Sequence, residues 1–117
     1  MDSNIQIWHN NRCGKSREAV KYLESKGLSF TQRLYMQDIP SKEEMKKMLK
    51  LLGIGASDWV RKKEKIYTEL FAGKNPSEDE LLDAMLLHPQ LIERPVVIVG
   101  KKAIIARPAE LIDSILP

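Results

Sequence analysis

The sequence contains a continuous run of β-branched residues, Val96-Val97-Ile98-Val99, and this run constrains the fold more than any other segment. A run without polar alternation is typical of a strand that is buried on both faces of a sheet. Gly100-Lys101 follows as a tight turn, and residues 102–106 return with Ile104 and Ile105. The segment therefore predicts a β-hairpin whose first strand is buried.

The first part of the chain has the pattern of a strand, a helix and a second strand. Alternating apolar residues over 4–8 predict a short strand. Apolar residues at helical spacing over 15–26, followed by Gly27, predict a helix and its end. Alternation over 29–35 predicts the second strand. A strand-helix-strand unit implies parallel strands joined by a right-handed crossover.

The middle of the chain is predicted to be helical. Two capping boxes, Ser41 with Glu44 and Ser77 with Glu80, predict the starts of two helices. Apolar residues at spacings of three and four follow each box, as in helices with one buried face. Between these helices, Ser57 is expected to cap a short helical turn.

A last helix is predicted after Pro108, because proline suits the first turn of a helix. The complete order is then β-α-β, a helical block, and β-β-α. We therefore expect an α/β fold of the thioredoxin-like type, a four-stranded mixed sheet with a helical insertion between its two halves. No repeat, low-complexity tract or long linker appears, so residues 1–117 are expected to form a single domain.

The composition predicts a soluble globular protein. Of the 117 residues, 43% are hydrophobic and 30% are charged, which argues against disorder. No stretch approaches the roughly 18 consecutive apolar residues of a membrane helix. The chain begins Met-Asp-Ser-Asn, which is unlike a secretory signal. We therefore expect a cytoplasmic protein without a membrane partner.

The formal net charge is +3, but the basic residues are not concentrated. The densest basic run is Arg61-Lys62-Lys63-Glu64-Lys65, which an acidic residue interrupts. This pattern is more typical of a solvated helix surface than of a nucleic-acid site. No nucleic-acid partner is therefore expected, and the small positive excess favours a small anionic substrate.

The chain has one cysteine, Cys13, so an internal disulfide is impossible. Cys13 lies in a polar loop directly before the first predicted helix, where free amide groups and the helix dipole stabilise a thiolate. Such positions lower a thiol pKa from about 8.5 to roughly 3.5–7.5. Lys15 adds positive charge, Ser16 can donate a hydrogen bond to the sulfur, and Gly14 permits close approach to the backbone.

Cys13 is either a small buried residue or a reactive thiol, and its neighbours favour the reactive thiol. The polar residues on both sides of Cys13 are unsuited to an apolar core. His9 has two open interpretations: it tunes the thiolate, or it caps the strand in solvent. One cysteine and two histidines are a poor ligand set, so no metal site is expected.

Four segments together resemble the glutaredoxin-coupled arsenate reductase family. They follow the family's order over nearly the whole chain, and no single segment is as specific alone. The segments are 9–17 (His-Asn-Asn-Arg-Cys-Gly-Lys-Ser-Arg), 61–67 (Arg-Lys-Lys-Glu-Lys-Ile-Tyr), 91–95 (Leu-Ile-Glu-Arg-Pro) and 106–110 (Ala-Arg-Pro-Ala-Glu).

The resemblance implies an enzyme that reduces arsenate to arsenite through an adduct of arsenic with the Cys13 thiolate. It implies glutathione and glutaredoxin as external partners that resolve the adduct, and no bound cofactor. The family's oxyanion-binding arginines match Arg61, Arg94 and Arg107. His9 matches the histidine before the loop, and Pro95 occupies the place of a cis proline that faces the cysteine.

The arginines are also reasonable oxyanion ligands by their chemistry, because a guanidinium pairs bidentately with tetrahedral oxyanions. Taken singly, each arginine is better explained by a surface ion pair. Considered together with Cys13, Arg61, Arg94 and Arg107 favour an oxyanion site.

Two alternative functions remain open at this stage. One is a glutathione-dependent thiol protein that acts on mixed disulfides, in which the arginines hold glutathione carboxylates. The other is a non-catalytic module that binds the transcription machinery, as in the related Spx-type regulators. Those regulators carry Cys-x-x-Cys at this loop, whereas this chain has Ser16 at the second position.

Overall fold

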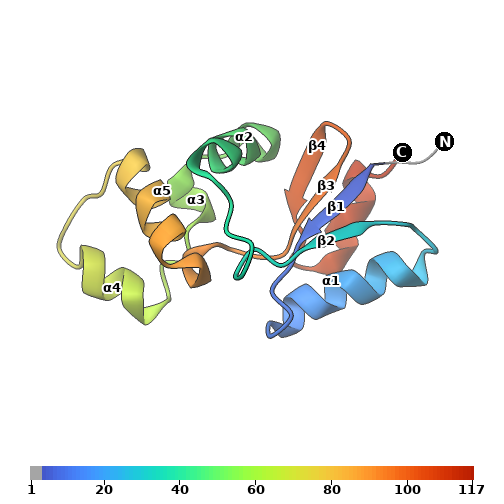
Figure 1. The fold of residues 1–117 in the computed structure, drawn as a ribbon, viewed down its shortest axis with the longest axis horizontal. Helices are drawn as coiled ribbons and strands as arrows, with labels where there is room; N and C mark the ends of the chain where they lie inside the picture. The colour runs from blue at the N-terminus through green and yellow to red at the C-terminus, as the bar shows by residue number, and fades with distance from the viewer. Residues whose placement is uncertain (1–3) are drawn as a thin grey trace. The chain divides into compact units, whose positions relative to one another are not determined.

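Four strands form one mixed sheet in the order β2-β1-β3-β4 (Figure 1). The strands are β1 (Ile5–Trp8), β2 (Thr31–Arg33), β3 (Val96–Val99) and β4 (Lys102–Ile105). β1 runs parallel to β2 and antiparallel to β3, which in turn runs antiparallel to β4. This computed structural model describes residues 4–117. The predicted α/β fold with a four-stranded mixed sheet is confirmed.

The chain divides into two compact units, a sheet unit of residues 4–38 and 94–117 and a helical unit of residues 39–93. The sheet unit contains the four strands, the helix α1 (Gly14–Ser25) and the 3-10 helix η2 (Ala109–Ile115). The helical unit contains α2 (Lys42–Leu52), α3 (Ala56–Trp59), α4 (Lys65–Phe71), α5 (Glu78–Leu87) and the 3-10 helix η1 (Pro89–Leu91).

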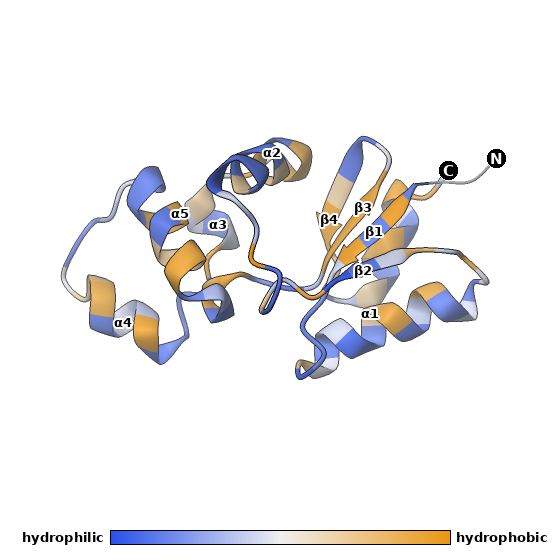
Figure 2. Cartoon of the chain, in the orientation of Figure 1, coloured by the Kyte–Doolittle hydropathy of each residue, from blue (hydrophilic) through white to orange (hydrophobic). Residues whose placement is uncertain are grey.

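The core of the sheet unit lies where α1 and η2 pack against one face of the sheet. Ala19 and Leu23 of α1 are fully buried, and their spacing of four places them on the same side of the helix. Figure 2 shows apolar residues along this helix alternating with polar ones. Nine buried residues make up this core: Ile5, Ile7, Ala19, Leu23, Val97, Val99, Ala106, Ala109 and Ile112.

The predicted hairpin is confirmed by the register of β3 and β4. Val96 pairs with Ile105 and Val99 with Lys102, so the turn falls on the two residues between Val99 and Lys102. Gly100 has φ +61, a conformation that other residues rarely adopt. Val96, Val97 and Val99 are buried and Ile98 is half-buried, as expected for an inner strand of the sheet.

Both capping boxes in the helical unit are present. The Ser41 side chain accepts a hydrogen bond from the Glu44 amide, and Ser77 does the same with Glu80. In each box the glutamate carboxylate accepts a hydrogen bond from the serine amide. Gly53 ends α2 in the left-handed region, with φ +69. The starts of α2 and α5 therefore follow from local sequence.

The expectation that Ser57 caps the short turn is wrong. Gly55 is the N-cap of α3, and glycine has no side chain to accept hydrogen bonds from the free amides of the helix. The carboxylate of Glu78 accepts hydrogen bonds from the amides of Ala56 and Ser57 instead. A carboxylate is favoured at a helix N-terminus because it satisfies free amides and faces the positive end of the dipole.

Three other elements differ from the sequence predictions. Strand β2 covers only Thr31–Arg33, which is shorter than the predicted 29–35. Helix α4 was not predicted: it has only seven residues and no side-chain cap, although its half-buried residues Ile66, Tyr67, Leu70 and Phe71 recur at helical spacing. The helix after Pro108 is a 3-10 helix, with Pro108 as its N-cap.

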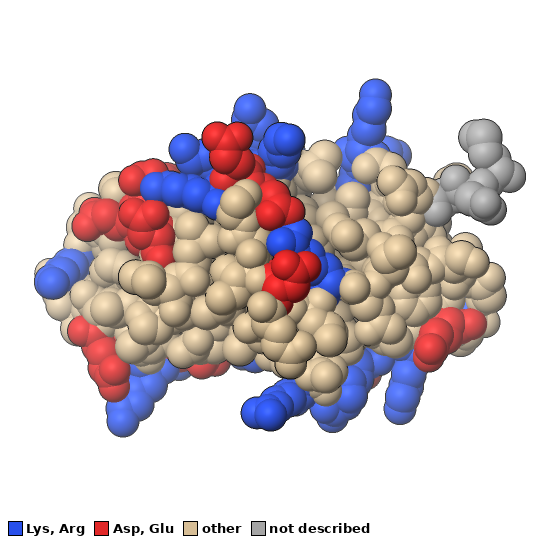
Figure 3. Space-filling model, viewed as in Figure 1, with Lys and Arg blue, Asp and Glu red and all other residues tan. Residues whose placement is uncertain are grey.

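Charged side chains of the helical unit are of mixed sign. Over its helices, basic side chains lie beside acidic ones (Figure 3). Lys42 Nζ lies 2.7 Å from Asp79 and 2.9 Å from Asp83, which links α2 to α5. Among residues 4–117, no helix is long and apolar enough to cross a membrane.

The core of the sheet unit predicts a clear contrast between two leucines. Replacing Leu23, which is 0% exposed, with alanine should lower the free energy of unfolding by about 2–5 kcal/mol, because a cavity remains. The matched change Leu87→Ala removes a side chain that is 77% exposed and should cost less than about 0.5 kcal/mol. Urea unfolding followed by circular dichroism measures both, and equal losses would contradict the assigned core.

Candidate active site

Cys13 lies at the N-cap of α1, at the end of the loop that follows β1. Its side chain is half-buried, and its carbonyl accepts the first hydrogen bond of the helix from the Arg17 amide at 3.0 Å. Asn10 shapes the loop: its side-chain oxygen accepts from the Arg12 amide, and its carbonyl accepts from the Cys13 amide, both at 3.0 Å. This turn holds the thiol at the start of the helix.

The pKa of Cys13 is lowered from its ordinary value by groups that act against burial. Burial is the largest single effect and raises the pKa, because it penalises the thiolate. The amide of Ser16, the side chain of Arg94 and the amide of Lys15 donate hydrogen bonds to the sulfur and outweigh burial. The charge of Arg94 also favours the thiolate. The combination gives a nucleophile that ionises readily.

Arg94 and Arg107 reach the sulfur because the hairpin brings their backbones together. Val96 pairs with Ile105, and the Ala106 amide donates to the Pro95 carbonyl at 2.9 Å. Nη1 of Arg107 lies 3.1 Å from the Arg94 carbonyl and 4.0 Å from the Cys13 sulfur. The structure therefore brings Cys13, Arg94 and Arg107 into one cluster.

The peptide bond between Arg94 and Pro95 is cis. This agrees with the cis proline implied by the family resemblance. A second cis bond joins Arg107 to Pro108, which sequence reasoning did not find. Both bonds directly follow an arginine of the cluster.

His9 and Ser16 form a buried pair below the loop. Nδ1 of His9 lies 2.6 Å from Oγ of Ser16, and the same Oγ accepts a hydrogen bond from the Asn10 amide at 3.0 Å. The Ser16 hydroxyl thus contacts His9 and the loop, and the backbone amide of Ser16 reaches Cys13. A hydrogen bond from the hydroxyl to the sulfur stays a prediction.

The pKa of His9 lies below its ordinary value. Burial is the main cause, because it penalises the charged imidazolium, and the positive charge of Arg17 adds to it. Nδ1 of a neutral His9 can accept a hydrogen bond from the Ser16 hydroxyl, and the ring N–H is then on Nε2. His9 is 5% exposed, which excludes the interpretation of a strand cap in solvent.

Three other residues in the first turn of α1 have contacts of their own near Cys13. Gly14 is the first residue of α1, and a Cβ there would meet only Arg17, at 3.8 Å. The side chain of Lys15 pairs with Glu18 at 3.6 Å in solvent. Nη1 of Arg17 donates to the Asn11 carbonyl at 3.2 Å and so joins the first turn of α1 to the loop. Sequence reasoning missed these loop contacts of Arg17 and Asn10, although asparagine is typical of such turns.

Arg61 belongs to the helical unit, where it is surrounded by acidic residues. Its guanidinium lies 3.7 Å from Glu64 and 3.8 Å from Glu93. Its amide donates to the Leu91 carbonyl at 2.7 Å, next to the bridge between Val60 and Ile92. The backbone around Arg61 is therefore fixed within its own unit.

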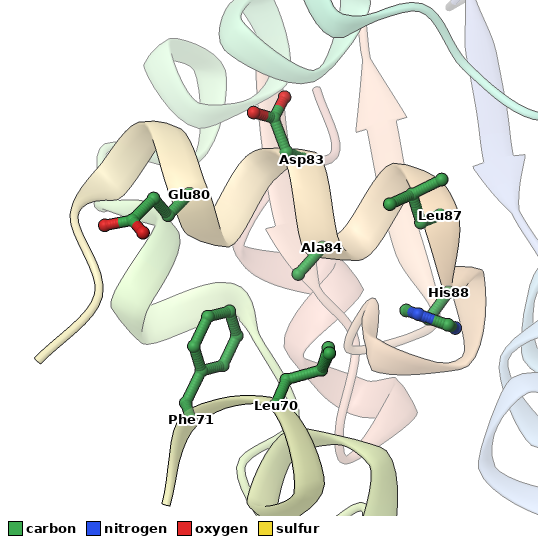
Figure 4. Close-up of a pocket in the computed structure, with 7 residues that line it drawn as sticks. All are labelled: Leu70, Phe71, Glu80, Asp83, Ala84, Leu87 and His88. Atoms are coloured by element: carbon green, nitrogen blue, oxygen red, sulfur yellow. The ribbon is translucent and has the colours of Figure 1, made fainter. Parts of the chain in front are cut away.

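A pocket of about 230 Å³ lies in the helical unit between α4 and α5 (Figure 4). Phe71 and Leu70 of α4 and Ala84 of α5 contribute apolar surface, and none of the predicted site residues lines it. No group of three or more histidine, cysteine or acidic side chains among residues 4–117 is arranged to hold a metal ion.

The fold and the cluster define a thioredoxin-like protein with one cysteine at a helix N-terminus beside two arginines. The sequence model of the ArsC family matches residues 8–115, and the chain belongs to this family. An arsenate reductase of Escherichia coli is 37% identical over 116 residues, which are 98% of this chain and 82% of that protein. The family resemblance predicted from the four segments is therefore confirmed.

Two further comparisons match the full length of the chain. The uncharacterized protein YfgD of Escherichia coli K12 is 37% identical over 118 residues, which cover 99% of both chains. The solved structure of an arsenate reductase from Vibrio cholerae has a TM-score of 0.93 and 38% identity, and the match covers 99% of this chain and 100% of that chain.

The contact between Arg94 and the sulfur predicts a change in thiol ionisation. Arg94→Gln should raise the pKa of Cys13, because the variant loses a charge and a charge-assisted hydrogen bond. The pH dependence of iodoacetamide alkylation measures this pKa. The control Lys101→Gln removes one positive charge from the hairpin turn. This turn lies near the start of β1, because Val99 pairs with Ile5, whereas the loop of Cys13 follows the other end of β1. Equal midpoints in both variants would contradict the role of Arg94.

The lowered pKa of His9 predicts that stability depends on pH. Below pH 6.5, the ordinary value, the unfolded chain binds a proton that folded His9 resists. The free energy of unfolding should therefore rise with pH up to about 6.5. Above that pH the contribution of His9 should be constant. His9→Asn should reduce this rise, whereas His88→Asn should retain it. Urea unfolding between pH 5 and 8 measures the effect; an unchanged slope in His9→Asn would contradict it.

Proposed function

We propose that the protein is an arsenate reductase that converts arsenate to arsenite. The observation that supports this most strongly is the cluster of a half-buried cysteine, its lowered pKa, and two arginines within the same unit. A thiolate is the nucleophile that the reaction needs, and guanidinium groups are suited to a tetrahedral oxyanion. Membership of the ArsC family, with relatives named arsenate reductase, supports the same reaction.

In this proposal, arsenate binds to Arg94, Arg107 and the amides at the start of α1. The positive end of the helix dipole and free amide groups favour an anion there. Arg61 serves as a third ligand, a role that rests on the family resemblance. Pro95, Gly14 and Lys15 support the loop, and His9 with Ser16 keeps it rigid. Residues 1–117 are proposed to carry this activity as a single arsenate reductase domain.

The reaction begins when the Cys13 sulfur attacks arsenic. A bond forms between sulfur and As(V), and one arsenate oxygen leaves as water after protonation. A second thiol then attacks the Cys13 sulfur, and the sulfur–arsenic bond breaks with its electron pair on arsenic. Arsenic leaves as As(III) in arsenite, and the two sulfurs are oxidised to a disulfide.

The second thiol must come from outside the chain, because Cys13 is its single cysteine. We propose glutathione for this step, with glutaredoxin restoring the Cys13 thiol by disulfide exchange. The protein needs no bound cofactor in this scheme, since both electrons come from thiols. A cytoplasmic location fits the proposal, because that compartment keeps thiols reduced.

The test is arsenate-dependent consumption of reductant in the presence of glutathione and glutaredoxin. Wild-type protein should turn over, and Cys13→Ser should lose at least about a thousandfold in kcat/KM. Arg107→Ala should lose about a hundredfold, because it removes a charged donor from the oxyanion. Lys101→Ala, on the hairpin turn, should retain wild-type activity.

Arsenate turnover that survives Cys13→Ser would overturn the mechanism. Exchange of glutathione mixed disulfides without any arsenate turnover would overturn the proposed substrate and favour the alternative thiol function.

A further inference from the structure

Arg61 of the proposed site lies beside two carboxylates, those of Glu64 and Glu93. We propose that Glu64 and Glu93 are counter-charges that an oxyanion must displace from Arg61, and that they thereby determine the strength and selectivity of anion binding. The inference deepens the proposed function and rests on it for the role of Arg61 as an anion ligand.

The ion pairs of Arg61 are close enough to compensate its charge and too long to satisfy its hydrogen bonds. The nitrogen–oxygen distances are 3.7 Å to Glu64 and 3.8 Å to Glu93. Charge-assisted hydrogen bonds of this kind are typically about 2.7–2.9 Å long. Nη1 of Arg61 is buried and has no hydrogen-bond partner among residues 4–117. The guanidinium therefore retains capacity for an acceptor that approaches more closely.

The backbone keeps both carboxylates beside Arg61. The Glu64 amide donates to the Arg61 carbonyl at 3.2 Å, just before α4 begins. Glu93 is held by Trp59: its amide donates to the Trp59 carbonyl, and Trp59 Nε1 donates to its carbonyl, both at 3.1 Å. These hydrogen bonds fix the backbone of both glutamates close to Arg61.

Partial burial makes this arrangement matter energetically. The side chain of Arg61 is 21% exposed, and those of Glu64 and Glu93 are 31% and 30% exposed. Charges in such positions are screened less than exposed ones. The two carboxylates and the guanidinium together carry a charge of −1, so these glutamates oppose the binding of an anion to Arg61. A tetrahedral oxyanion can offset this repulsion with short bidentate hydrogen bonds, whereas chloride cannot.

Sulfate is a suitable probe, because it is a tetrahedral dianion that does not react with thiols. We expect Glu93→Gln and Glu64→Gln each to bind sulfate about fivefold more tightly than wild type in calorimetric titration of the full chain. Chloride should compete with sulfate more effectively in both variants. The control Glu69→Gln removes the same charge from the exposed pair with Lys65, at 4.0 Å, and should leave the affinity unchanged.

A double-mutant cycle separates competition for Arg61 from a general field effect. In an Arg61→Gln background, Glu93→Gln should no longer strengthen sulfate binding. In kinetics, Glu93→Gln should lower KM for arsenate about fivefold and leave kcat unchanged, as expected for uniform binding. Circular dichroism and thermal unfolding verify that each variant is folded.

Each result decides for or against the inference. Unchanged or weaker sulfate binding in both glutamine variants would overturn it. An equal gain in the Arg61→Gln background would also overturn it, because the glutamate would then act without Arg61. If sulfate behaves as expected but no variant reduces arsenate, the proposed function fails while the competition for Arg61 stands. If arsenate is reduced but the glutamates have no effect, the inference alone fails.

Discussion

The antiparallel pairing of β1 with β3 is the contact on which the cysteine cluster depends. Trp8 pairs with Val96, so the loop that carries Cys13 leaves the sheet where the segment before Val96 enters it. Val96 also pairs with Ile105, which brings Arg107 to the same edge. Three segments that are distant in sequence therefore meet at one point. The two-residue turn after Val99 fixes the register of the β3–β4 hairpin, and therefore the position of Arg107 relative to Val96.

At this edge, opposing electrostatic effects decide the state of the thiol. Half-burial alone would keep Cys13 protonated, since a charge loses solvation when it is removed from water. Amides of the first turn of α1 and the guanidinium of Arg94 replace the lost water, and their combined effect is the larger. The helix supplies donors without a side-chain entropy cost, because its amides are already oriented. The site therefore combines shielding from solvent with a stabilised thiolate.

The sequence predicted those features that depend on short-range patterns. The capping boxes, the hairpin around Gly100 and the position of Cys13 before α1 are local, and all are present. Helix α4 was missed because it is short and has no side-chain cap. The cap of α3 was missed because the acceptor of its free amides, Glu78, is distant in sequence. The contact of the Ser16 hydroxyl with His9 was not predicted for a similar reason, because the two side chains meet only in the folded loop.

The three arginines of the proposed oxyanion site contact different groups within their own units. Arg107 donates to the carbonyl of Arg94, a neutral acceptor that orients the guanidinium toward the Cys13 sulfur. Arg94 directs its charge to the Cys13 sulfur. Arg61, in the helical unit, faces carboxylates instead. A partly buried charge needs a partner, and the type of partner determines how much field remains for a ligand. In the competition proposed above, Arg61 exerts its full charge on a ligand only after that ligand has displaced the two carboxylates.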